Sequence, residues 1–137
     1  MTGQRRDLNR EKFKLEKLSA VFKNPESNAN KNLKYLKNAM DIRAKLPQFH
    51  PQSMMECLSR SRGDIVVIKR GIGSKAIFTI HNMTENKINY RFINFEFNKL
   101  SKNDLNMQDF LTSNKYNSNN IELNPFQVIW LSYLIDD

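Results

Sequence analysis

Cysteine, histidine and long apolar runs are scarce in this chain of 137 residues. Its one cysteine, Cys57, cannot form an internal disulfide, and one cysteine with two histidines offers too few ligands for a structural zinc site. No apolar run approaches the ~20 residues of a membrane-spanning helix, and no signal-peptide core follows Met1. These absences favour a cytoplasmic protein that has no metal, no cofactor and no membrane partner.

Positive charge is concentrated in the first third of the chain. Residues 1–50 contain twelve Lys and Arg against five Asp and Glu, whereas residues 51–137 contain ten against nine. A basic segment of this kind is typical of many nucleic-acid-binding proteins. However, the eighteen asparagines and the excess of fourteen lysines over eight arginines are also the composition that an AT-rich coding sequence produces. We therefore expect no nucleic-acid partner.

Helical periodicity occurs at 13–22 and 28–46, where apolar residues recur three and four positions apart. Pro25 separates the two segments, Ser27 is the expected N-cap of the second, and Pro47 ends it. The second segment has two apolar stripes, which are Ala29, Leu33, Leu36 and Met40, and Tyr35, Ala39, Ile42 and Leu46. Two stripes are more than a lone surface helix needs.

The apolar period changes to two from residue 53 onward. Four β-rich runs lie at 53–59, 64–71, 75–82 and 88–97. A polar connection at 98–120 follows, and the chain closes on an expected strand pair at 121–135 that Asn124-Pro125 interrupts. The patterns predict an α+β chain in which a short N-terminal helical segment precedes a small antiparallel β-sandwich of six to eight strands.

Motifs that carry chemistry are largely missing. His50 lies in a turn and His81 ends a strand, so each is expected to make structural hydrogen bonds. The segment 70–75 joins two strands and predicts a hairpin turn, because phosphate-binding loops precede helices. Asn82-Met83-Thr84 matches the glycosylation triplet, but nothing indicates secretion. The carboxylates are scattered, and we assign no catalytic residue and no metal ligand.

Five segments nevertheless follow one another in an informative order. They are Thr2-Gly3…Arg6…Leu8-Asn9-Arg10-Glu11-Lys12, Arg43-Ala44…Pro47…Phe49-His50-Pro51, Ile80-His81-Asn82, Gln108-Asp109-Phe110-Leu111, and Leu123-Asn124-Pro125-Phe126-Gln127-Val128…Trp130-Leu131. Together they cover nearly the whole chain. In this order the segments resemble the sucrose phosphorylase and glucosylglycerate phosphorylase branch of the α-amylase superfamily.

The resemblance implies that residues 1–50 are the terminal loop and helices of a (β/α)8 barrel, a TIM barrel, and that residues 51–137 are a C-terminal all-β domain. In this family the arginine of the Asn-Arg pair lines the pocket for the transferred glucosyl unit. The matching residue is Arg10, with Asn9 beside it. A guanidinium suits this role because its fixed fork of donors can hold sugar hydroxyls or a carboxylate in one geometry.

The family's reaction is a retaining double displacement, in which a carboxylate takes the glucosyl unit and phosphate later accepts it. The resemblance places the catalytic carboxylates upstream of every segment found here. A barrel needs at least ~200 residues. We therefore expect a C-terminal fragment that is inactive alone, with Met1 at an internal start, a split gene or a truncated reading frame. It would meet α-glucoside and phosphate only with a complete barrel, which a separate chain could supply.

Two other interpretations stay open. The chain could be a stand-alone β-sandwich module that binds glucan or a protein through aromatics such as Trp130 or Tyr133, although the alternation around Trp130 favours core packing. It could also be a basic nucleic-acid-binding protein that acts through residues 1–45.

Overall fold

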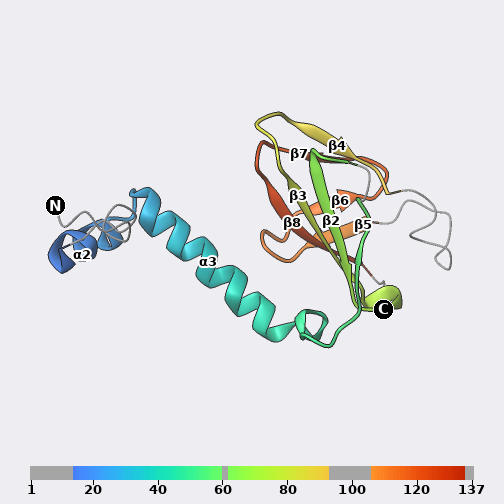
Figure 1. Ribbon diagram of the computed structural model, residues 1–137, viewed down its shortest axis with the longest axis horizontal. Helices are drawn as coiled ribbons and strands as arrows, with labels where there is room; N and C mark the ends of the chain where they lie inside the picture. Colours follow the sequence, from blue (N-terminus) through green and yellow to red (C-terminus); the bar gives the residue numbers. More distant parts are fainter. Residues whose placement is uncertain (1–13, 60–61, 93–105, 135–137) are drawn as a thin grey trace, which may run out of the picture. The chain divides into compact units, whose positions relative to one another are not determined.

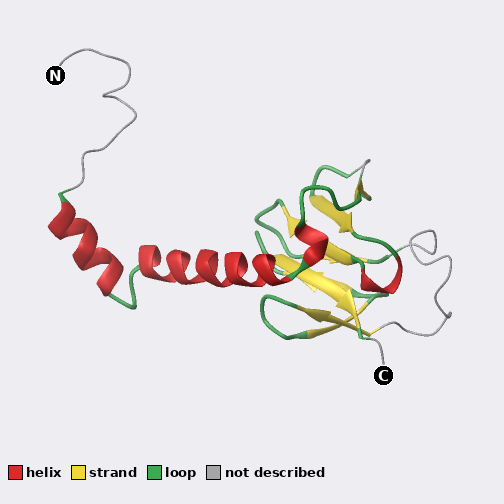
Figure 2. Ribbon diagram, turned by 90° about the horizontal axis from the view of Figure 1, so that it is seen from below, coloured by secondary structure: helices red, strands yellow, loops and turns green. Residues whose placement is uncertain are grey.

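A computed structural model describes residues 14–59, 62–92 and 106–134 of the chain (Figure 1). The chain divides into two compact units, Met1–Met40 and Asp41–Asp137, which are treated one at a time below. Figure 2 shows that the two long helices precede the strands along the chain. The fold is therefore α+β with antiparallel strands, as the sequence predicts. The boundary at residues 50 and 51 that the resemblance implies stays a prediction.

Both expected helices are present. Helix α2 spans Leu15–Lys23 and α3 spans Asn28–Lys45. The predicted N-cap is confirmed, because the backbone N–H of Asn30 donates to the Ser27 hydroxyl oxygen at 3.1 Å. Neither helix contains a buried residue.

Helix α3 ends before Pro47, as the sequence predicts, but a separate short helical turn begins at this proline. A single 3-10 turn, η1, spans Pro47–Phe49, and the Phe49 N–H donates to the Leu46 carbonyl at 3.0 Å. Proline is compatible with the first turn of a helix because its missing N–H would have no partner there. The side-chain amide of Gln48 then donates to the Lys75 carbonyl at 2.7 Å, which attaches η1 to the loop after strand β2.

Six strands form the larger sheet, in the order β1-β2-β3-β8-β5-β6, and every neighbouring pair is antiparallel. The strands are β1 Met55–Cys57, β2 Ile65–Arg70, β3 Ile77–Asn82, β8 Val128–Tyr133, β5 Asn106–Asp109 and β6 Lys115–Asn117. The hairpin expected at 70–75 is confirmed, because Arg70 is paired with Ile77. Gly71 is required there: its φ is 81°, and a Cβ would lie 2.9 Å from Gln48 Cγ.

The second sheet consists of β4, Ile88–Tyr90, and β7, Ile121–Leu123. This arrangement corrects the expected strand pair at 121–135, because β7 and β8 lie in different sheets and do not pair with each other. The expected polar connection at 98–120 is also corrected, since β5 and β6 form a hairpin within it. The part of the expected strand at 93–97 lies outside the described residues.

One hydrophobic core joins the two sheets. Its members are Ile65, Val67, Ala76, Phe78, Ile80, Tyr90, Phe92, Met107, Ile121, Leu123, Ile129 and Leu131. Successive side chains of a strand point to opposite faces, so Ile129 and Leu131 face the core while Val128 and Trp130 lie on the opposite, outer face of the larger sheet. Edge-on packing of Phe78 against Phe92, at 4.9 Å between ring centroids, lies within this core.

Limited trypsin digestion should therefore cleave first at the lysines between residues 14 and 37, where the helices bury no residue. The strand lysine Lys69 should be cleaved later, because β2 is paired on both sides. Mass spectrometry of early time points would locate the cuts. A first cut within 65–82 would contradict the expectation that the strands form the more stable unit.

Candidate functional site

The residues expected to line a glucosyl pocket, Arg10 and Asn9, lie outside the described residues. Their assignment stays a prediction that rests on the resemblance. All residues of the other four segments lie within the described ranges.

Carboxylates in the described ranges do not gather into a catalytic or metal-binding group. Three form exposed ion pairs, which are Glu26 with Lys31, Asp64 with Arg62, and Glu122 with Lys87. The Arg62 guanidinium hydrogen-bonds Asp64 and lowers the pKa of that carboxyl. Among residues 14–59, 62–92 and 106–134, no three His, Cys, Asp or Glu side chains are placed to hold a metal ion.

Asn82 is the first motif residue with an unusual environment. It is 2% exposed at the end of β3, and its amide donates to the carbonyls of Asn86 at 2.7 Å and Asn124 at 2.8 Å. Its side-chain oxygen accepts from the backbone N–H of Thr84 at 2.9 Å. Both amide hydrogens are used, so this buried asparagine cannot accept a glycan in the folded chain. It fixes the β3–β4 turn against the β7–β8 turn instead.

Asp109 has the same kind of role at the end of β5. It is fully buried, and its carboxylate accepts from the N–H of Leu111 at 3.1 Å, the N–H of Trp130 at 2.8 Å and the hydroxyl of Thr112 at 2.6 Å. Because each carboxylate oxygen has a donor, the burial of this group is compensated. Asp109 therefore orders the β5–β6 turn and holds it on β8.

Gln127 completes this set of buried and half-buried polar residues. Its side-chain oxygen accepts from the Asn124 N–H at 2.8 Å, and its backbone carbonyl accepts from the Asn82 N–H at 2.9 Å. The periodicity of the sequence does not distinguish these residues from surface polar groups. The only signal for them in the sequence is that they lie within the five segments that carry the resemblance.

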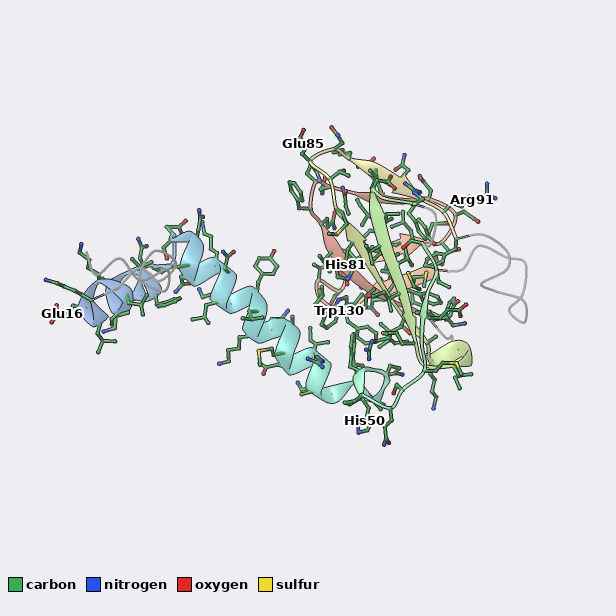
Figure 3. All side chains as sticks on the ribbon, in the orientation of Figure 1. Glu16, His50, His81, Glu85, Arg91 and Trp130 are labelled. Atoms are coloured by element: carbon green, nitrogen blue, oxygen red, sulfur yellow. The ribbon has the colours of Figure 1, made fainter. Side chains whose placement is uncertain are left out.

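Trp130 corrects the expectation of core packing. It is half-buried on the outer face, and its ring lies 4.7 Å from that of Phe49, tilted by 40°. The Arg70 guanidinium also lies over the Phe49 ring, 5.5 Å from the ring centre. Figure 3 labels Trp130 and His81 on the neighbouring strands β8 and β3. Trp130 is thus a packing site for η1 and not an open platform for sugar.

Tyr133, the other aromatic residue considered for binding, lines a shallow pocket of about 310 Å³. The pocket lies where β8 meets the β5–β6 hairpin, and its lining residues are Gln108, Asp109, Phe110, Ser113, Ser132 and Tyr133. The Phe110 side chain is 38% exposed there. Asp109 is fully bonded, so the side chains lining the pocket bring no charge that is free to bind a ligand.

The sequence predicts structural hydrogen bonds for both histidines, and one of this kind is present at His50. His50 is exposed, and its Nδ1 accepts from the backbone N–H of Gln52 at 3.2 Å. His81 is half-buried on the outer face, between Val66 of β2 and Val128 of β8. Burial lowers the pKa of His81 because it disfavours the charged imidazolium.

Helix α3 exposes large apolar side chains of its first stripe. Leu33, Leu36 and Met40 of the first stripe are 48%, 59% and 60% exposed. Ile42 and Leu46 of the second stripe are half-buried. Among the described helices none is long and apolar enough to cross a membrane. The first α3 stripe, Leu33, Leu36 and Met40, is therefore the candidate functional surface of the described chain.

Comparison of the chain with protein-family models and with curated proteins found no match.

Replacing Asn82 by alanine should destabilise the fold by about 2–4 kcal/mol, since carbonyls and an N–H at the buried turn would lose their partners. The matched control is Asn89→Ala, which removes an exposed amide from β4 and should change stability little. Urea unfolding measured by fluorescence would compare them. Equal stability of the two variants would contradict the role given to Asn82.

Stability should fall when the pH drops below about 6.5, the ordinary pKa of histidine. The folded-state pKa of His81 is lowered, so the unfolded chain binds a proton first and acid favours unfolding. Urea midpoints at several pH values between 5 and 8 would show this, and His81→Gln should flatten the dependence. His50→Gln should leave it in place, because His50 is exposed. An unaltered pH dependence in His81→Gln would exclude His81 as its source.

Proposed function

We propose that this chain is the C-terminal part of a retaining α-glucosyl phosphorylase of the sucrose phosphorylase and glucosylglycerate phosphorylase branch. The observation that carries the proposal is the order of five recurring segments over nearly the whole sequence. In this proposal residues 1–50 end a (β/α)8 barrel, and residues 51–137 form a small C-terminal β-sandwich. The catalytic carboxylates belong to the barrel.

Direct contacts between the recurring segments support the proposal. The third segment bonds the fifth, because the Asn82 amide donates to the Asn124 carbonyl. The fourth bonds the fifth through Asp109 and the Trp130 N–H. The second reaches the fifth through the rings of Phe49 and Trp130. Residues up to 81 positions apart in sequence, such as Phe49 and Trp130, therefore contact one another in one folded unit. Such contacts are expected of residues that stabilise a shared domain.

The proposed role of the domain is to complete the barrel. Arg10 would enter the glucosyl pocket and hold sugar hydroxyls or the nucleophilic carboxylate, while Asn9 would position the loop. A carboxylate from the barrel would take the glucosyl unit, an acid would protonate the leaving oxygen, and phosphate would then accept the sugar. The chain would supply binding and assembly, and the barrel would supply the chemistry.

The second candidate function is a stand-alone binding module. The observation that favours it is the pocket beside Phe110 and Tyr133, where two aromatic residues adjoin hydroxyl and amide groups. A lining of this kind, in which the carboxylate of Asp109 is already hydrogen-bonded, suits a sugar or a polar peptide segment. Trp130 does not add to it, since its ring is packed on Phe49.

The test joins the chain, in one polypeptide, to the catalytic barrel of a sucrose phosphorylase that ends before the segment equivalent to Thr2-Gly3. The fusion should release glucose 1-phosphate from sucrose and phosphate, whereas the isolated chain should release none. Arg10→Ala should lower the rate roughly 10- to 100-fold, as expected for the loss of a charged hydrogen bond of about 1.5–3 kcal/mol. Arg5→Ala, outside the recurring positions, is the matched control.

Two outcomes would contradict the proposal. A folded fusion without transfer activity would exclude the chain as the domain that completes such a barrel. Wild-type activity in the Arg10→Ala fusion would show that the glucosyl-pocket role does not belong to this residue. Binding of a glucan by the isolated chain, lost in Phe110→Ala, would favour the stand-alone module instead.

A further inference from the structure

We propose that residues 46–53 form a strap that opens from the outer face of the larger sheet as one piece, with the ring of Phe49 as its latch. These residues and the sheet on which they pack belong to the same compact unit, Asp41–Asp137. The proposal concerns a movement within that unit, and it does not depend on the proposed phosphorylase function.

Hydrogen bonds inside the strap hold it together. The backbone N–H of Phe49 donates to the Leu46 carbonyl at 3.0 Å. The N–H and the hydroxyl of Ser53 donate to the carbonyls of His50 and Pro47, each at 2.9 Å. Because these bonds begin and end within the strap, they stay intact when the strap leaves the sheet.

Side chains hold the strap on the sheet. The Gln48 amide donates to the Lys75 carbonyl at 2.7 Å, and the Arg70 guanidinium donates to the Gln48 carbonyl at 3.3 Å. The Phe49 ring packs on Trp130, and the Arg70 guanidinium lies over the same ring. Among the described residues, no backbone-to-backbone hydrogen bond joins the strap to a strand of the sheet. The strap can therefore detach without breaking the β ladder.

Closure of the strap leaves one polar atom unmatched. The side-chain oxygen of Gln48 is buried, and in the part of the chain that the structure describes it has no hydrogen-bond donor. A buried acceptor without a donor is costly, and water can reach this oxygen once the strap opens. Closing thus gains the contacts of Phe49, while opening recovers the hydration of Gln48. Opposing contributions of this kind allow a segment to open locally while the rest of a domain stays folded.

Opening of the strap uncovers Trp130. This ring is half-buried on the outer face, and Phe49 is the strap residue that packs on it. The β unit thus contains an aromatic surface whose accessibility is set by the position of the strap. Trp130 is also the single tryptophan of the chain, so its fluorescence reports whether the strap is closed.

The experiment uses the full chain without denaturant. Acrylamide quenching and the emission maximum follow Trp130, and hydrogen exchange of the β3 and β8 amides follows the sheet. Phe49→Ala should raise the ratio of open to closed strap roughly tenfold, because it removes the aromatic contact. Quenching should then increase and emission should shift to longer wavelength, while β3 and β8 exchange as slowly as before. Phe49→Tyr keeps the ring and should leave quenching unchanged.

Arg70→Gln separates opening of the strap from a mere gap beside Trp130. This variant leaves the Phe49 ring in place, so Trp130 gains access to acrylamide only if the strap moves away. The loss of the guanidinium from the Phe49 ring should raise the ratio of open to closed strap about threefold. The matched control is Phe126→Ala, which removes a ring that is 67% exposed in the β7–β8 turn and should leave quenching unchanged.

Three results would overturn the proposal. Unchanged quenching in Phe49→Ala would show that this ring is not the latch. Increased quenching in Phe49→Ala together with unchanged quenching in Arg70→Gln would show a local gap and no movement of the strap. Exchange of the β3 and β8 amides that accelerates in step with quenching would show that strap and sheet open together.

Discussion

The pairing of β8 with both β3 and β5 is the constraint on which the β unit depends. Strand β8 lies near the C-terminus, yet it is inserted between the β1-β2-β3 meander and the β5–β6 hairpin. Without it, these two pieces would be short sheets with open edges and incomplete apolar faces. The pairing also brings Ile129 and Leu131 into the core that the two sheets share.

Polar residues secure this central strand just before its start and near its middle. Asp109 accepts a hydrogen bond from the Trp130 N–H, and Gln127 accepts one from the Asn82 N–H through its carbonyl. These groups are buried or half-buried, where an unmatched donor or acceptor would be costly, so they favour one register of β8 over a slipped one. Asn82, Asp109, Gln127 and Trp130 all belong to the five segments singled out in the sequence.

The two units differ in the way their apolar residues are used. In the β unit, apolar residues from both sheets form one core, and the outer face carries Phe49 packed on Trp130. In α2 and α3, apolar residues follow helical spacing but none is buried.

Local features of the sequence determined α3, its Ser27 cap and the hairpin at 70–75, because these depend on neighbouring residues alone. The α3 stripe was also predictable, since its residues follow the helical period. The separation of β7 from β8 and the outer-face position of Trp130 were decided by tertiary structure. Periodicity specifies that a segment is a strand, but pairing partners many residues away decide which sheet it joins and which of its faces is covered. Arg10 and Asn9 stay predictions from resemblance, because both lie outside the described residues.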